Sequence, residues 1–426
     1  MVQRNVCLRT DKGFPRVALS LHSFRTPLSP LSEMDSKAKN ALEGLASHFP
    51  AFKPILESLL SLYQKRHWHQ ITQQILDLSS SACQANAQPL LMPLLEEFVI
   101  PFVCTQMNPV EFSRIAIAAS ESISSAGERI VFLNERVAEA MNLETKDKNA
   151  FLNCKCQVLR LFLSVKEQAK AHETLLTCKR VFEELDTSID TAIKRLYFKA
   201  TCEYDKYTFD CNSFYFSCLQ YLSSTPLEGI SLAERVEIAH DLCVAALLGS
   251  KIFHFGELLL NPVLNALQTN GGANAALLPL IAAFNAGRVE EFQAFSAFIQ
   301  GHSVLGKHVE WLVKKVSLMA LLELSFTRIG SAGRSVTFGE IAAFARIPVE
   351  EVECLTMQAM SLGLLEGKID QTRGILLVEA VQPRVLDKRQ IGALAESILA
   401  FKLQVAQAVS KLQMESHELL AHFPAK

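Results

Sequence analysis

The sequence predicts a mainly α-helical protein that combines an α-solenoid of helical repeats, a winged-helix module and a long C-terminal helix. Between residues 37 and 326, apolar residues recur with helical spacing in one segment after another. Two short helical patterns and two β-rich stretches follow between residues 335 and 386. After residue 387 the apolar spacing alternates between three and four residues, as in helices that pack into bundles. These three observations determine the predicted fold class.

The chain is too long, at 426 residues, for one ordinary hydrophobic core, so we expect several parts. Residues 1–33 form an N-terminal extension, and residues 34–230 form the helical-repeat solenoid. Residues 231–386 form a second domain, with a helical part at 231–334 and the winged helix at 335–386. Residues 387–426 form the C-terminal helix.

Residues 1–33 differ in composition from everything after them. They carry five basic side chains and two acidic ones, together with several Ser and Pro. This composition is typical of a transit peptide. It is also expected if the gene model extends upstream of a working start at Met34, which is the explanation we favour. We expect disorder in this segment in either case.

The solenoid prediction rests on helices of ordinary length that are separated by short breaks. An amphipathic helix of this size cannot bury its apolar face alone, so consecutive helices should stack as degenerate repeats. We expect these helices at residues 52–63, 68–78, 90–103, 111–123, 130–141, 150–165, 175–185, 192–204 and 214–222.

The winged helix is predicted from capping and turn residues. Thr337 and Glu340 have the spacing of a capping box at the start of its first helix. Pro348 suits the first position of a second helix, which Gly363 can end in a left-handed conformation. Two short strands, at 365–369 and 375–381, complete a hairpin.

The charge of this module argues against DNA binding. Residues 337–386 carry four basic and seven acidic side chains, a net charge of −3. A recognition helix needs Arg, Lys, Asn or Gln in its first turns, but the sequence has Glu350, Glu351 and Glu353 there. Such a surface repels phosphate, so we expect a protein-docking module and no nucleic-acid partner.

The overall composition indicates a scaffold in a reducing compartment. Lys plus Arg number 42 and Asp plus Glu number 44, so the net charge of −2 indicates neither a polyanion binder nor an acidic tail. No uninterrupted apolar run reaches 18 residues, so we expect no membrane span. The 11 cysteines are scattered without a CxxC motif, which favours buried free thiols.

Three sequence features resemble chemical sites, but none has the residues that its chemistry requires. His67 and His69 have the spacing of a metallo-isopeptidase pair, yet Asp77 and Ser80 stand where that motif has Ser and Asp. The glycine-rich stretch 269–272 lacks the Lys-Ser/Thr of a phosphate loop. The third feature is a group of cysteines without zinc-finger spacing or a basic partner: Cys154, Cys156, Cys178, Cys202, Cys211 and Cys218. We therefore predict no catalytic, cofactor-binding or metal-binding residues.

Two apolar stretches are the candidate subunit interfaces. The second hairpin strand would present an exposed apolar edge in a monomer, through Ile375, Leu376, Leu377 and Val378. The C-terminal helix, which a capping box of Asp387 and Gln390 would start, carries a heptad seam with no long partner helix elsewhere in the chain. The seam consists of Ile391, Leu394, Ile398, Phe401, Val405, Ala408 and Leu412.

Several motifs, in the same order, resemble those of the family of 26S proteasome non-ATPase regulatory subunit 13, a family of PCI-domain lid subunits. The similarity covers roughly residues 48–417, and its motifs are structural rather than catalytic. They lie at residues 68–70, 253–259, 261–264, 283–290, 326–328, 337–338 and 381–387.

The resemblance implies a PCI fold, in which winged helices of six subunits pair into an arc and C-terminal helices gather into a bundle. It also implies a non-catalytic, hetero-oligomeric subunit of the cytoplasm and nucleus, which supports ubiquitin-dependent protein degradation. Equivalent PCI subunits of the COP9 signalosome or of translation initiation factor 3 are the alternatives. They share the architecture but lack the motifs at 253–264 and 381–387.

Overall fold

The computed structural model describes residues 31–85, 88–137, 147–185, 189–270, 272–329, 334–382, 385 and 388–415. Its contacts divide the described residues into two compact units, one that ends at Ser124 and one that begins at Ser125. The predicted N-terminal extension lies largely outside the described residues. Its last three residues belong to a helix, because helix α1 begins at Leu31.

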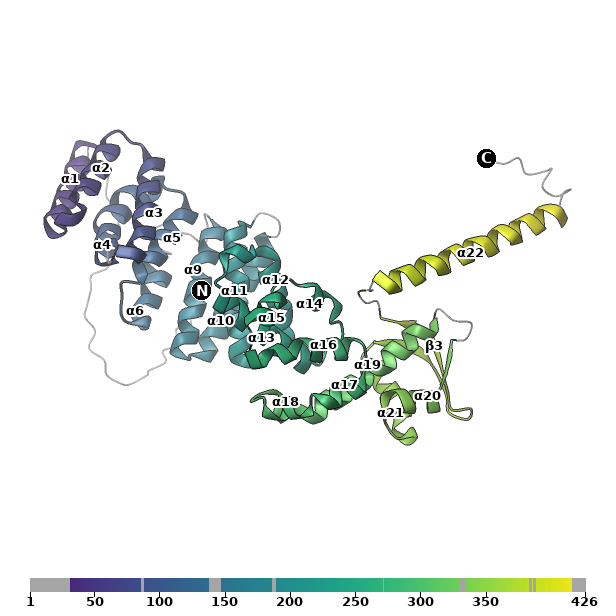
Figure 1. The fold of residues 1–426 in the computed structure, drawn as a ribbon. Helices are drawn as coiled ribbons and strands as arrows, with labels where there is room; N and C mark the ends of the chain where they lie inside the picture. Colours follow the sequence, from purple (N-terminus) through teal and green to yellow (C-terminus); the bar gives the residue numbers. More distant parts are fainter. Residues whose placement is uncertain are drawn as a thin grey trace, which may run out of the picture. The chain divides into compact units, whose positions relative to one another are not determined.

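The first unit is a set of packed helices (Figure 1). Their buried side chains form an apolar core. Asn108 accepts a hydrogen bond from the Val110 amide at 3.0 Å and so caps α5, with Pro109 at the next position. Pro93 and Pro101 lie inside helical segments, and the segment around Pro101 is π-helical. The elements are α1 (Leu31–His48), η1 (Pro50–Phe52), α2 (Lys53–Gln64), α3 (Trp68–Ala85), α4 (Gln88–Leu94), η2 (Leu95–Val103), η3 (Cys104–Gln106) and α5 (Pro109–Ser120).

One segment of this unit, Pro89–Gln106, has the length and apolar composition of a membrane span, with a mean hydropathy of 1.2. It carries Glu96 and Glu97, and the core helix of a soluble protein has the same composition. Its buried side chains are Leu90, Leu91, Leu94, Leu95, Phe98, Val99, Val103 and Cys104. These side chains make up 44% of the segment, so packing in the core accounts for part of its apolar composition.

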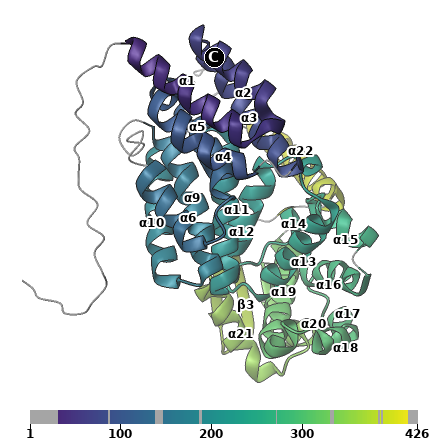
Figure 2. The same ribbon diagram turned by 90° about the vertical axis from the view of Figure 1, so that its left-hand side faces the viewer.

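The second unit continues as stacked helices, and Figure 2 shows α9 to α12 side by side. Acidic residues start three of these helices, because Asp147, Asp190 and Asp210 each accept hydrogen bonds from first-turn amides. The elements are α6 (Ala126–Val131), η4 (Phe132–Val137), α9 (Lys148–Val165), α10 (Gln168–Leu185), α11 (Thr191–Thr208), α12 (Cys211–Ser224), η6 (Leu227–Gly229) and α13 (Leu232–Leu248).

Ion pairs join every second helix of this stack, from α9 to α11 and from α11 to α13. Arg160 of α9 contacts Glu203 of α11 at 2.7 Å, and Lys199 of α11 contacts Glu234 of α13 at 2.8 Å. These side chains are about one-third exposed, so each pair adds little stability by itself.

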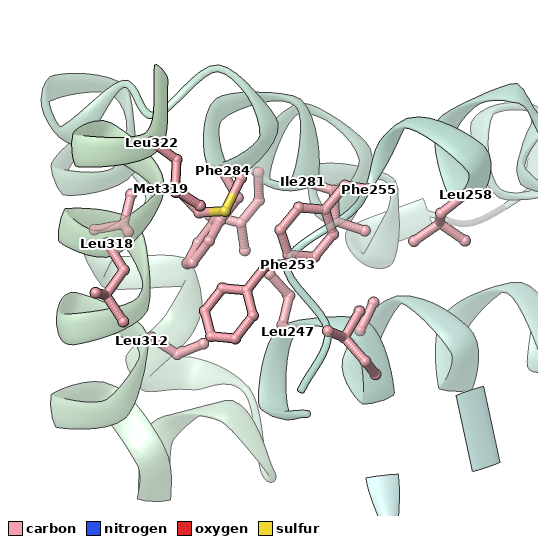
Figure 3. Close-up of a cluster of buried hydrophobic side chains, with 14 of the residues drawn as sticks. Leu247, Phe253, Phe255, Leu258, Ile281, Phe284, Leu312, Leu318, Met319 and Leu322 are labelled. Atoms are coloured by element: carbon pink, nitrogen blue, oxygen red, sulfur yellow. The ribbon is translucent and has the colours of Figure 1, made fainter. Parts of the chain in front are cut away.

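The helices after α13 enclose an aromatic core (Figure 3). Phe255 and Phe284 are fully buried, and their rings meet edge to face at 6.1 Å. Gly287 has φ of +62°, and a Cβ there would lie 2.7 Å from the Ala320 Cα of α19, so only glycine fits. The elements are α14 (Gly256–Leu260), α15 (Leu264–Asn270), η7 (Gly272–Ala276), α16 (Leu277–Asn285), α17 (Val289–Ala294), α18 (Ser296–Gly301), η8 (Leu305–His308) and α19 (Val309–Ile329).

A buried lysine ties α19 to the end of α13. Lys315 is fully buried, and its ammonium donates to the carbonyls of Ala246, Leu247 and Gly249 at 2.7, 3.2 and 2.6 Å. The last carbonyls of a helix lack partners within the helix, so this side chain supplies them with donors. The rings of Phe253 and Phe255 each lie 5.3 Å from the ammonium.

The winged helix follows α19 and confirms the predicted capping. The Glu340 amide donates to the Thr337 hydroxyl at 3.3 Å, and the Thr337 amide donates to the Glu340 carboxylate at 3.0 Å. Pro348 lies one position before the second helix, and Gly363 ends it with φ of +68°. The elements are β1 (Ser335–Thr337), α20 (Phe338–Ala345), α21 (Val349–Ser361), β2 (Leu365–Asp370) and β3 (Ile375–Val381), before the final helix α22 (Lys388–Glu415).

Helical repeats, a winged helix and a long C-terminal helix are all present, so the predicted fold class is confirmed. The predicted domain boundaries at residues 230 and 386 remain predictions.

Candidate assembly interface

The hairpin strand that we expected at an open edge is in fact the central strand of a three-stranded sheet. The strand order is β1-β3-β2, and β3 pairs antiparallel with both neighbours. Ser335–Thr337, where the sequence predicts only the Thr337 cap of the next helix, forms β1 and covers β3 from Ile375 to Leu377. The expectation of an exposed apolar edge at residues 375–378 is therefore wrong.

Because β3 pairs with a strand on each side, its four predicted interface residues alternate between the core face and the solvent face of the sheet. Leu376 and Val378 point into the core and are 0% and 1% exposed, while Ile375 is half-buried. Leu377 points to the opposite face and is 44% exposed. Side chains alternate along a strand, so only Leu377 offers a substantial apolar surface to a partner. The predicted interface on the β2–β3 hairpin, the wing of the winged helix, is therefore reduced to the exposed face of β3 that carries Leu377.

The seam on α22 is open to solvent along its whole length. Every side chain from Ile391 to Met414 is exposed. The large seam residues have exposed fractions between 44% and 65%: Ile391, Leu394, Ile398, Phe401, Val405 and Leu412. The predicted capping residue Asp387 and the Gln390 side chain lie outside the described residues.

A second apolar stripe on α22 escaped the sequence analysis. Leu399, Leu403 and Met414 are 58%, 64% and 79% exposed. At about 100° per residue they lie roughly opposite the seam. A search for one heptad pattern selects the seam and passes over this stripe. A helix that is apolar on two sides has the pattern of one buried among several others.

The second helix of the winged module carries an acidic and apolar outer surface. Glu350 and Glu351 are exposed in the first turn of α21, near the exposed side chains Val349 and Met357. The cation nearest to this helix along the chain, Arg346, contacts Glu290 of α17. The arrangement is unfavourable for phosphate and favourable for protein contacts.

The histidine and glycine features show no chemical site in the described residues. His67 and His69 are exposed on either side of the half-buried Trp68, which meets Tyr63 edge to face at 5.6 Å. Residue 271 of the glycine-rich stretch lies outside the described residues. Within the described part of the chain, no group of three or more His, Cys, Asp or Glu side chains could hold a metal ion.

The predicted cysteine group lies mainly in the helix cores. Cys154, Cys156, Cys178 and Cys218 are buried, whereas Cys202 and Cys211 are partly exposed. Burial raises the pKa of the Cys154 thiol to about 12. A nucleophilic cysteine needs the opposite shift, so this thiol is a packing residue.

Comparison with known proteins places these features in one family. The model of PSD13 N-terminal repeats matches residues 55–281, and the PCI domain model matches residues 290–380. The chain is 28% identical over 390 residues to 26S proteasome non-ATPase regulatory subunit 13 of Dictyostelium discoideum, covering 89% of this chain and 98% of that protein.

A fission-yeast relative is more similar over a shorter span. The probable 26S proteasome regulatory subunit rpn9 of Schizosaccharomyces pombe is 34% identical over 333 residues, covering 78% of this chain and 84% of that protein. Eukaryotic translation initiation factor 3 subunit M of Aspergillus oryzae is 27% identical over 202 residues, covering 46% of this chain and 42% of that protein. Repeats, PCI domain and full-length similarity agree, and the chain belongs to the family of 26S proteasome non-ATPase regulatory subunit 13, whose yeast members are named Rpn9.

Proposed function

We propose that this chain is a non-catalytic structural subunit of the regulatory-particle lid of the 26S proteasome. It enters the complex through its winged helix and α22, as one member of a hetero-oligomer that supports ubiquitin-dependent protein degradation in the cytoplasm and nucleus. The observation that carries the proposal is the exposed apolar helix α22. The membership of the chain in the family of 26S proteasome subunit 13 supports the choice of this complex.

The exposure of α22 is the physical reason for expecting partners. Soluble monomers rarely expose contiguous apolar patches larger than a few hundred Å². Every side chain of α22 from Ile391 to Met414 is exposed, so the stripes are open within 24 residues of helix, a length of about 36 Å at 1.5 Å per residue. Other helices that cover both stripes would remove this surface from water.

Affinity purification tests the proposed complex. A tagged full-length chain, purified from its source cell, should bring down the other PCI-domain and lid subunits, identified by mass spectrometry. Translation initiation factor 3 is the alternative that the partial similarity to subunit M favours. Recovery of initiation-factor subunits, or of COP9 signalosome subunits, in place of lid subunits would reject the proposal.

The wing supplies a test of the interface itself. Leu377→Lys places a charge on the outer face of β3, where the native side chain is 44% exposed. We expect unchanged helix content by circular dichroism and loss of the chain from the purified lid. Leu260→Lys, at an exposed leucine of α14 outside the winged helix, is the matched control and should assemble normally. Normal assembly of the Leu377 variant would exclude this face.

The non-catalytic part of the proposal has its own test. The histidine pair lacks the remaining motif residues, and no cofactor is expected. Elemental analysis of the purified chain should find no stoichiometric zinc, and the chain should leave ubiquitin chains uncleaved. One zinc per chain, or cleavage that the His67→Ala variant abolishes, would contradict this part.

A further inference from the structure

Two imidazoles from distant parts of the chain face each other in the second unit. His240 lies on α13, and His302 follows α18, 62 positions later. Their Nε2 atoms are 3.1 Å apart, and the rings are nearly parallel with centroids 5.3 Å apart. Such a short distance between ring nitrogens indicates a hydrogen bond, so one nitrogen carries a proton and the other does not.

The surroundings of His302 decide which nitrogen carries the proton. The backbone amides of Val304 and Leu305 both point to its Nδ1, at 3.4 Å each. An amide N–H only donates, so Nδ1 must be unprotonated and act as the acceptor. A neutral imidazole then carries its proton on Nε2, which donates to His240.

The rest of the chain of hydrogen bonds is consistent with this assignment. Nε2 of His240 accepts from His302, so its own proton lies on Nδ1, which donates to the Asp241 carboxylate at 3.0 Å. The other carboxylate oxygen of Asp241 contacts the Lys206 ammonium of α11 at 2.6 Å. Each member therefore has a fixed donor or acceptor role, from Lys206 to the turn at Val304.

This turn forms part of a cavity wall. The cavity has a volume of about 590 Å³, and its lining includes His240, Asp241, Val304 and Trp311. The other titratable side chains that line it come from α11, the start of α12 and η8. They are Asp205, Lys206, Asp210, Cys211 and His308. Lys206 also pairs with Glu237 of α13 at 2.8 Å.

We propose that His302 is a proton-operated latch that holds the turn at residues 302–305 against α13. A proton added to His302 has only Nδ1 to occupy, because Nε2 already carries one. The new N–H then faces two amide N–H groups, and both hydrogen bonds are lost. The turn has to move away, which displaces Val304 and opens this wall of the cavity.

The latch is closed at neutral pH and opens on acidification. Burial, and secondly the neighbouring His240 ring, lower the pKa of His302 below its ordinary value of 6.5. Because the folded state holds this proton less tightly than the unfolded chain, the stability contributed by the neutral form is complete above pH 6.5. It is lost as the pH falls through the lowered pKa of His302.

Nuclear magnetic resonance of the full chain, labelled with ¹⁵N, tests the assignment without any substitution. At pH 7.5 the imidazole of His302 should be the Nε2–H tautomer. On titration its protonation midpoint should lie below pH 6.5, and the amide signals of Val304 and Leu305 should shift with that midpoint. An Nδ1–H tautomer, or a midpoint at or above 6.5, would overturn the proposal.

Two histidine variants then separate the latch from its surroundings. Asn in His302→Asn keeps a side-chain acceptor for the two amides but cannot be protonated, so the shifts of the Val304 and Leu305 signals should disappear. His308→Asn, in the lining of the same cavity, is the matched control and should leave these shifts in place. If the shifts persist in the His302 variant, or vanish only in the His308 variant, His302 is not the latch.

Discussion

Replacing Lys315 by Met should destabilise the second unit by about 1–3 kcal/mol, the range found when a buried polar group is left without its hydrogen-bond partner. Met has a similar length but no donor, so the carbonyls of Ala246, Leu247 and Gly249 lose their side-chain partner in a dry core. The two phenylalanine rings that face the ammonium lose a favourable electrostatic contact as well. We therefore expect the junction of α13 and α19 to be the most sensitive point of this unit.

Urea unfolding, followed by Trp311 fluorescence in a Trp68→Phe background, measures the effect. The sequence has two tryptophans, so this background reports on the second unit alone. Lys314→Met is the matched control, because Lys314 is the exposed neighbour on the same helix. Its free energy of unfolding should change by less than about 0.5 kcal/mol. Equal effects of the two substitutions would show that the buried contacts contribute little.

The loss of stability caused by Lys315→Met should depend on pH, because the amine of Lys315 is buried. Desolvation lowers the pKa of Lys315 to about 7, against an ordinary value of 10.5. Between these values the unfolded chain binds more protons than the folded one, so the stability due to this residue rises with pH. The loss caused by Lys315→Met should therefore be larger at pH 9 than at pH 7.

Replacing Ile398 and Phe401 together by Asp should remove the chain from the lid while leaving its own fold intact. Both side chains are exposed in the isolated chain, at 59% and 65%, so the chain loses no internal packing. Full burial of a large apolar side chain against a partner is worth roughly 1.5–3 kcal/mol. Two such side chains together are worth about 3–6 kcal/mol, so at about 1.4 kcal/mol per factor of ten the double substitution should weaken assembly by about two to four orders of magnitude.

Co-purification with lid subunits and circular dichroism together check this result. The matched control is the pair Gln404→Ala and Gln413→Ala, two exposed polar residues that lie between the two apolar stripes of the same helix. The control should assemble like the native chain. If the control co-purifies with lid subunits as weakly as the Asp variant, any change on this helix weakens assembly, and the seam has no specific role.

The parts of the fold that local sequence determines were predictable. Thr337 with Glu340, and Gly363, are capping and turn residues whose effect extends over only a few positions, and the structure confirms each of them. The apolar periodicity of the helices is local in the same sense. This also explains why the α22 seam could be read from spacing alone.

The parts that depend on distant contacts could not be predicted. β1 is three residues long, and it exists only because Val336 pairs with Leu376, forty positions away. Lys315 stands in an apolar helix, where a lysine gives no sign that it reaches carbonyls almost seventy positions earlier. The tautomer of His302 likewise depends on a partner 62 residues away.

The most direct test of the assembly role is a chain that ends at Leu386 and so lacks α22 altogether. Every described side chain of α22 from Ile391 to Met414 is exposed, so the rest of the chain should fold without the helix. We predict a soluble monomer whose remaining units unfold at the same urea concentration as in the full chain. We also predict that this monomer is absent from lid complexes purified through another lid subunit. Co-purification of the truncated chain with those subunits at the native level, or its failure to fold, would contradict the conclusion that α22 is the element through which this chain assembles.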